Sequence, residues 1–320
     1  MSTTLSLQEW LQFIDDEYLS SGFIRDGGAA VKFAVTPEPL KADLDNAVRR
    51  RCREYGFVVA RLDAAEVRAY MPQDIFFGLA RQVDWRVLSR RFILRLAAEK
   101  SYSVEGVDDN ASGNIFDAIA GANGLEKRLI MQNLRPTLQD KVFRNPNMAR
   151  DFRVAMCHLC EGEDVLDNGS YSKQPVLDWL RGDNSRVSSV RHFAIYSSIN
   201  RTTARYFIQS TLYWIQFSGC AGTVVLLDNS RVTLARNPKD DRRYYTRAMT
   251  LDHYELLREF VDDSDRLPGL LLFVVTGEDF LDENPASRGY GVYPALRTRI
   301  MNDVRDRNLI NPVASLVRLS

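Results

Sequence analysis

The sequence is poor in the side chains that most hydrolases and metalloproteins depend on, with three histidines and four cysteines in 320 residues. It contains no Gly-x-Ser-x-Gly elbow, no His-Glu-x-x-His helix and no glycine-rich dinucleotide fingerprint. Only the pair Cys157 and Cys160 has a spacing typical of metal ligands, and His192 and His253 stand alone, whereas a zinc site needs about four ligands. We therefore expect the cysteine thiols to be structural or solvent-facing. We also expect little general-base catalysis by histidine.

Net charge and long apolar runs are also lacking. The 42 Lys and Arg residues balance 42 Asp and Glu residues, so any contact with nucleic acid or an anionic membrane needs a local patch. The longest apolar runs, such as residues 270–275, fall far short of the roughly 20 residues of a membrane helix, and the N-terminus has no basic or apolar leader. We expect a soluble, cytoplasmic protein without a membrane partner.

What the sequence does contain is a set of apolar runs separated by helical patterns. Residues 31–35 and 57–62 are strand-like and are joined by a charged helix over residues 40–55, which is the unit from which parallel sheets are built. Residues 223–228 and 270–276 are apolar almost throughout, which is typical of strands buried on both faces. The pattern predicts an α/β fold with a parallel sheet covered by helices.

The sheet is interrupted by a long helical stretch. From residue 64 to residue 191 the pattern is helical and polar, and we interpret it as an insertion rather than a separate enzyme domain. The predicted division is an N-terminal helix and the first part of the α/β core in residues 1–63, the helical insertion in 64–191, and the remainder of the core in 192–320.

One predicted strand carries half of a nucleotide site. An ATPase with such a sheet needs an apolar strand that ends in an acid, which holds Mg²⁺, and usually a glutamate next to it that positions water. Here Asp228 ends the strand, but Asn229 follows, and a carboxamide cannot accept a proton as glutamate does. An apolar strand that ends in aspartate is common in α/β proteins, so Asp228 by itself does not establish a magnesium site.

The phosphate-binding half of the site is missing. An ATPase loop after the first strand is rich in glycine, because its N–H groups cradle phosphates. Residues 36–43 contain no glycine, two prolines that lack N–H donors, and the acids Glu38 and Asp43. Lys41 is the one candidate remnant of a phosphate-binding lysine, and a single lysine is more often a solvated helix residue.

Several stretches of the chain together resemble the ATP-binding protein family of bacterial BREX antiphage systems. The resemblance is carried by residues 23–35, 55–63, 194–201, 219–228, 267–276 and 293–297. It implies an AAA-like P-loop NTPase fold with a helical insertion between the second and third strands, which agrees with the layout read from the residues.

The resemblance also implies roles for individual residues. Asp228 would hold Mg²⁺, Thr276 would sense the γ-phosphate, and Arg297 or Arg299 would lie where such ATPases offer an arginine to a neighbouring subunit. The departures at residues 36–43 and at Asn229 affect the two elements that hydrolysis can least spare, because phosphoryl transfer is mainly positioning and charge stabilisation. The chain therefore looks like a degenerate, non-catalytic paralogue.

Three functions follow from these observations. The first is a pseudo-ATPase that acts as a scaffold or regulator in a defence complex, with an active ATPase, helicase or nuclease of the same system as its partner and with no cofactor of its own. The second is an active ATPase with an unusual phosphate loop, in which Lys41 and Asp228 bind ATP and Mg²⁺. The third is a DNA contact through residues 49–53 or residues 288–307, where Arg297, Arg299, Arg305 and Arg307 interleave with tyrosines.

Overall fold

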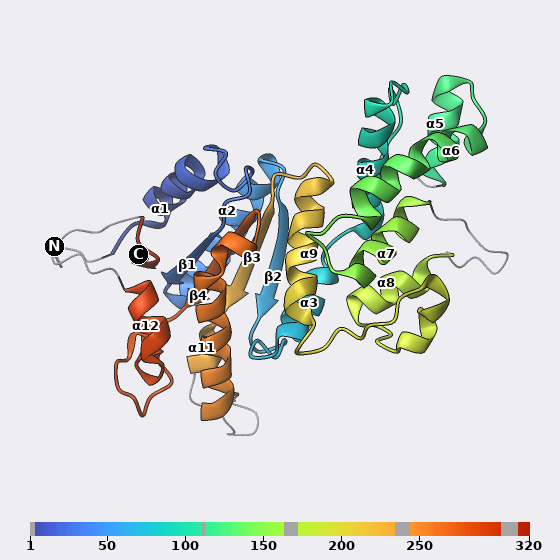
Figure 1. The fold of residues 1–320 in the computed structure, drawn as a ribbon. Coiled ribbons are helices and arrows are strands. Elements are labelled where there is room, and N and C mark those ends of the chain that lie inside the picture. Colours follow the sequence, from blue (N-terminus) through green and yellow to red (C-terminus); the bar gives the residue numbers. More distant parts are fainter. Residues whose placement is uncertain (1–3, 110–112, 163–171, 234–243, 302–312) are drawn as a thin grey trace. The chain divides into compact units, whose positions relative to one another are not determined.

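The computed structural model describes residues 4–109, 113–162, 172–233, 244–301 and 313–320. The chain forms two compact units, one built from Met1–Leu79 and Cys220–Ser320 and the other from Ala80–Gly219. The first unit contains the sheet and the second is helical over its described residues (Figure 1). The domain boundaries expected at residues 64 and 191 stay a prediction.

The first unit is built on a parallel sheet of five strands. Their order is β2-β3-β4-β1-β5, and every neighbouring pair is parallel. This confirms the predicted α/β fold of the P-loop NTPase type, and it adds β5, a short strand that the apolar pattern did not reveal. The strands are β1 (Ala30–Val35), β2 (Val58–Asp63), β3 (Thr223–Asp228), β4 (Leu270–Thr276) and β5 (Leu316–Arg318).

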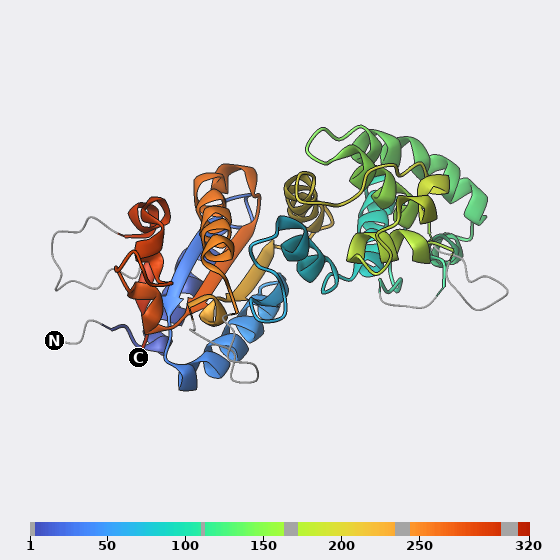
Figure 2. The same cartoon turned by 90° about the horizontal axis from the view of Figure 1, so that it is seen from below.

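Helices cover both faces of this sheet, as parallel strands with crossover connections require. Figure 2 shows α2 and α11 on opposite faces. The first helix begins with a capping box, in which Ser6 and Glu9 satisfy each other's backbone N–H groups. The helices of this unit are α1 (Leu7–Ile14), α2 (Glu38–Glu54), α3 (Pro72–Ala80), α10 (Ser230–Thr233), α11 (Arg247–Asp262) and α12 (Pro294–Ile300).

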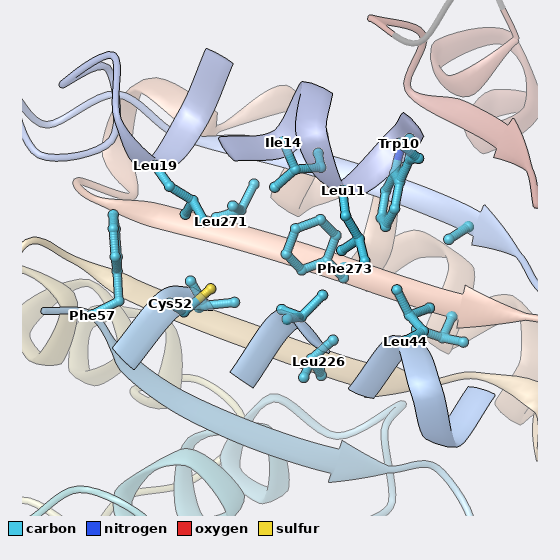
Figure 3. Packing of buried hydrophobic residues seen from close by; sticks show 14 of the residues in the cluster. Trp10, Leu11, Ile14, Leu19, Leu44, Cys52, Phe57, Leu226, Leu271 and Phe273 are labelled. Carbon is cyan, nitrogen blue, oxygen red and sulfur yellow. The ribbon is translucent and has the colours of Figure 1, made fainter. Parts of the chain in front are cut away.

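An apolar core lies between the sheet and α1 and α2 (Figure 3). Trp10 is fully buried and meets the ring of Phe273 edge-on at 5.4 Å between centroids. Leu44 and Cys52 enter from α2, and Leu226 enters from β3. Because side chains alternate along a strand, these contacts fix which residues of β3 and β4 point toward α2.

The opposite face packs against aromatic side chains. Phe33 of β1 stacks on Phe280 at 5.8 Å, and Phe280 in turn meets Tyr254 of α11. Both phenylalanines are fully buried. Residues of β1 that point this way alternate with those that face α1 and α2, so the sheet is buried on both sides as its apolar runs predicted.

The helical unit has a core of its own. Trp85 meets Phe152, Trp179 meets Phe207, and Phe92 lies 5.1 Å from the ring of Trp214. The helices that supply these rings and their neighbours are α4 (Trp85–Glu99), α5 (Ile115–Asn123), α6 (Lys127–Leu138), α7 (Arg150–Cys160), α8 (Gln174–Arg181) and α9 (Ala204–Phe217).

Candidate nucleotide site

The carboxyl ends of the parallel strands meet at one edge of the sheet, which is where ligands of open α/β sheets bind. Asp63 of β2 lies beside Asp228 of β3, and Thr276 of β4 lies beside Val35 of β1. Val224 and Leu226 point into the core beneath α2, so Asp228, two residues further on, points to the same face. The acid is therefore directed at the space next to the beginning of α2.

A pocket of about 280 Å³ occupies that space. It brings Lys41 and Asp228 together, as the nucleotide-site interpretation requires. It also contains two residues that the sequence did not single out, Asp45 and Arg61, because only the fold places α2 beside the end of β2. The lining residues are Glu38, Lys41, Ala42, Asp45, Asn46, Arg61, Leu226, Asp228 and Val275.

A chain of hydrogen bonds joins the lysine to the acid through Ser230. Lys41 Nζ donates to Ser230 Oγ at 2.5 Å, and that hydroxyl donates to Asp228 Oδ1 at 2.5 Å. The backbone N–H of Ser230 donates to the same carboxylate oxygen at 2.9 Å. Lys41 also forms an ion pair with Glu38, the first residue of α2. Two of the three ammonium protons are thus engaged within the chain.

The lysine is largely withdrawn from solvent, although its ion-pair partner is not. The side chain of Lys41 is 13% exposed, whereas that of Glu38 is 84% exposed. Glu38 stands at the N-terminus of α2, where the helix dipole favours a negative group. A carboxylate of the chain itself therefore occupies the place where a nucleotide phosphate would meet both the lysine and the helix end.

The connection between β1 and α2 is short and offers few free backbone N–H groups in the described structure. Only two residues, Thr36 and Pro37, separate the end of β1 from the beginning of α2. The N–H of Thr36 donates to Thr276 O at 2.8 Å and the N–H of Leu40 donates to Pro37 O at 2.9 Å. Pro37 and Pro39 have no N–H. Four of the five positions 36–40 therefore cannot offer an N–H group to a phosphate.

Asn229 is turned away from this pocket. It is fully buried, its N–H donates to Val275 O at 2.7 Å, and its side-chain oxygen lies 2.6 Å from Nε2 of His253 in α11. His253 Nδ1 lies 2.9 Å from Ala69 O, a carbonyl that can only accept, so Nδ1 carries the proton. Burial lowers the pKa of His253 to about 4, so the ring is neutral near pH 7.

A neutral His253 needs a donor opposite Nε2. The Asn229 carboxamide keeps its shape when it is rotated by 180°, and in that orientation its NH₂ group donates to Nε2. The rotation also gives a partner to Nδ2, which otherwise has none among the described residues. Asn229 thus forms a buried contact with α11 and does not face the space where water would attack a phosphate.

The other residues that the resemblance suggested are not in the pocket. Thr276 is fully buried, and strand alternation directs it to the face opposite that of Val275, where its hydroxyl has no partner among the described residues. Arg297 and Arg299 lie on α12. Arg297 Nη2 pairs with Glu283 at 2.9 Å, and Arg299 Nε pairs with Asp262 at 2.9 Å.

Two arginines of the first basic stretch are paired with acids. Arg49 pairs with Asp45 at 3.1 Å, and Arg51 pairs with Asp15. Cys52, between the arginines, is fully buried. Of the second stretch, Arg305 and Arg307 lie outside the described residues.

The thiols and acids show no arrangement for metal chemistry in the part of the chain that the structure describes. No group of three or more His, Cys, Asp or Glu side chains there can hold a metal ion. Burial raises the pKa of Cys157 to about 12, so this thiol is neutral near pH 7. Among the described helices, none is long and apolar enough to cross a membrane.

The family of the chain follows from its similarity to known proteins. No curated protein and no solved structure matches the chain. The family model described as BREX system ATP-binding protein BrxC/D matches residues 122–320, which is more than half of the sequence. That region contains β3, β4 and β5, including the strand that ends in Asp228. The chain therefore belongs to the BrxC/D family of BREX system ATP-binding proteins.

Proposed function

We propose that this chain is a non-catalytic ATPase-like subunit that acts as a scaffold or regulator within a BREX antiphage system. Membership of the BREX ATP-binding family supplies the defence role and implies partners within that system. The observation that carries the non-catalytic part is the two-residue connection between β1 and α2, which has no glycine and two prolines close by.

The contacts of Lys41 support the same proposal. A phosphate would have to displace Glu38 from the ammonium group and approach Asp228 at the same time. Both are carboxylates, so the approach is repulsive unless a cation bridges the charges. Asn229 cannot act as a base, and its side chain is hydrogen-bonded to His253. The site therefore lacks both phosphate binding and water activation.

Under this proposal the partner carries the nucleotide chemistry. We expect a catalytically active ATPase, or a helicase or nuclease of the same system, to bind this chain. Arg297 and Arg299 are about two-fifths exposed and are paired with acids of their own chain, so to serve a partner's site they would first have to leave Glu283 and Asp262. Assembly is thus the expected activity of this subunit.

Active hydrolysis is the second candidate, and one observation favours it. Lys41 and Asp228 share a pocket and are joined through Ser230, so the two charged groups of an ATPase site are present together. In that case Glu38 would swing into solvent when Mg·ATP binds, which its exposure permits.

Calorimetric titration of the full chain with ATP and Mg²⁺ separates the two candidates. For a pseudo-ATPase we expect no saturable heat into the millimolar range, and no change with Lys41→Ala or Asp228→Ala. Saturable binding that both substitutions remove, with release of phosphate, would establish the active ATPase instead. The scaffold role is tested by co-expression with the other proteins of the system, where we expect this 36.5 kDa chain to elute in a larger complex. Elution as a free monomer would contradict it.

A further inference from the structure

One stretch of the helical unit is rich in arginine and contains no acid. Residues 184–219 contain Arg186, Arg191, Arg201 and Arg205 but no aspartate or glutamate. The unit as a whole has 19 Lys and Arg residues against 15 Asp and Glu residues. All four arginines are exposed. An anionic partner is therefore favoured at this stretch by long-range charge as well as by contact.

Two tyrosines of the same unit are exposed. Tyr196 is 55% exposed and Tyr206 is 62% exposed, and both belong to the helical unit. The guanidinium group of Arg150 lies over the Tyr196 ring, 5.4 Å from its centre. The planar, positively charged guanidinium group and the aromatic ring therefore lie next to each other. Tyr206 lies in the first turn of α9, next to Arg205. We call Arg150, Tyr196, Arg201, Arg205 and Tyr206 the tyrosine–arginine face.

The loop that carries Tyr196 is held by a buried acid. Asp151 is 3% exposed, and its Oδ2 accepts the backbone N–H groups of Tyr196 at 2.8 Å and Ser197 at 2.5 Å. Its Oδ1 accepts from Arg150 at 2.5 Å. One carboxylate therefore positions both the ring and the arginine that lies over it.

The backbone that carries Tyr206 is connected to the same place. Ser210 Oγ accepts the N–H of Ala149 at 2.8 Å and donates to Tyr206 O at 2.6 Å, so the beginning of α7 is joined to the first turns of α9. Asn200 Oδ1 accepts the N–H groups of Thr202 and Thr203, the two residues that precede α9. Both tyrosines are thus exposed on backbone that is held by side-chain hydrogen bonds.

We propose that the tyrosine–arginine face binds single-stranded nucleic acid. Proteins that bind single strands combine cations along the backbone with aromatic rings on which successive bases stack. Bases in a duplex are already stacked on each other and cannot use such rings without being unpaired. Residues 184–219 offer no acid to pair with a basic protein partner. This proposal uses none of the residues of the nucleotide pocket, so it stands or fails independently of it.

The test is fluorescence anisotropy of a labelled oligothymidylate titrated with the full chain at several salt concentrations. For the double variant Tyr196→Ala with Tyr206→Ala we expect binding at least tenfold weaker, because two stacking rings are removed. The matched double variant to phenylalanine keeps both rings and should bind as the wild type does. Phe143 is 49% exposed elsewhere in the unit, and Phe143→Ala controls for the removal of an exposed ring.

The arginines are tested by the salt dependence. Replacement of Arg201 and Arg205 by glutamine should lower the slope of log K against log salt by about 0.7 for each phosphate that is no longer neutralised. Arg144, whose side chain is 73% exposed, provides the control Arg144→Gln, which should leave the slope unchanged. Absence of wild-type binding at low salt would overturn the proposal. So would equal weakening in the phenylalanine or control variants, or tighter binding of duplex than of single strand, which would indicate a different partner for this face.

Discussion

At the scale of single residues, the end of β3 divides its polar side chains between two tasks. Asp228 faces the pocket and binds Ser230, whereas Asn229 faces the interior and binds His253. The alternation of a strand sends neighbouring side chains to opposite faces, and that geometry explains the division. The second position of the expected acid pair is therefore a structural position in this fold.

His253 makes the stability of the protein depend on pH. Its pKa is about 4 in the folded chain and about 6.5 when unfolded, because burial disfavours the charged ring. Between these values the unfolded state binds more protons, so the free energy of unfolding is fully retained above pH 6.5 and falls as the pH drops toward 4. A shift of this size corresponds to about 3 kcal/mol.

Urea unfolding of the wild type and of His253→Gln at a series of pH values isolates this effect, since all other titrating groups are shared. We expect the stability advantage of the wild type to shrink by about 3 kcal/mol as the pH is lowered from 7 to 4. A difference that stays constant across this range would show that His253 is not buried as a neutral ring.

At the scale of elements, close approach of backbones decides where glycine is needed. Gly222 precedes β3 with φ of +153°, and its carbonyl accepts the N–H of Val58 at the start of β2. A Cβ on this residue would lie 2.6 Å from Gly269 O, which is backbone and cannot move aside cheaply. The start of two neighbouring strands therefore depends on the absence of one side chain.

We expect Gly222→Ala to destabilise the sheet unit by about 2 kcal/mol or more, because the clash is with backbone and the φ value is strained for alanine. Gly121 in α5 is the matched control. No atom outside its own helix turn lies within 4 Å of the place that a Cβ would take, so Gly121→Ala should be neutral or stabilise by up to about 1 kcal/mol. Denaturant midpoints measure both, and destabilisation of equal size in both variants would contradict the steric argument.

At the scale of the whole molecule, the two units differ in charge as well as in architecture. The helical unit has 19 basic against 15 acidic residues, and the sheet unit has 23 against 27, although the chain is neutral. The chain is neutral because the excess of acidic residues in the sheet unit equals the excess of basic residues in the helical unit. The more positive unit carries the tyrosine–arginine face, whereas the more negative unit contains the nucleotide pocket with its own carboxylates.

Because each unit has its own aromatic core, we expect two transitions in calorimetric unfolding. Trp10 and Trp179 are almost completely buried, one in each core. Trp10→Ala should lower the midpoint of one transition and Trp179→Ala that of the other, each through a destabilisation of about 3–5 kcal/mol. A single transition that both substitutions shift equally would contradict the division into two units, and with it the predicted domain organisation.

The sequence by itself determined the fold class, and it predicts a weak nucleotide site. Continuous apolar runs identify strands buried on both faces, and the lack of glycine with two prolines near Lys41 argues against a phosphate cradle, because both are local properties of the chain. Family membership, shown over residues 122–320, agrees with the resemblance carried by residues 194–201, 219–228, 267–276 and 293–297. Strand β5, only three residues long, had too little pattern to be recognised.

Only the tertiary structure decided which side chains meet. Ser230 meets Lys41, which is 189 positions away, and His253 engages Asn229, which is 24 positions away. The tyrosine–arginine face likewise depends on Asp151, which lies 45 residues before Tyr196. Periodicity predicts which residues of one element share a face, but it carries no information on the partner element. Those contacts are set by the packing of distant segments, and the function of each polar residue follows from them.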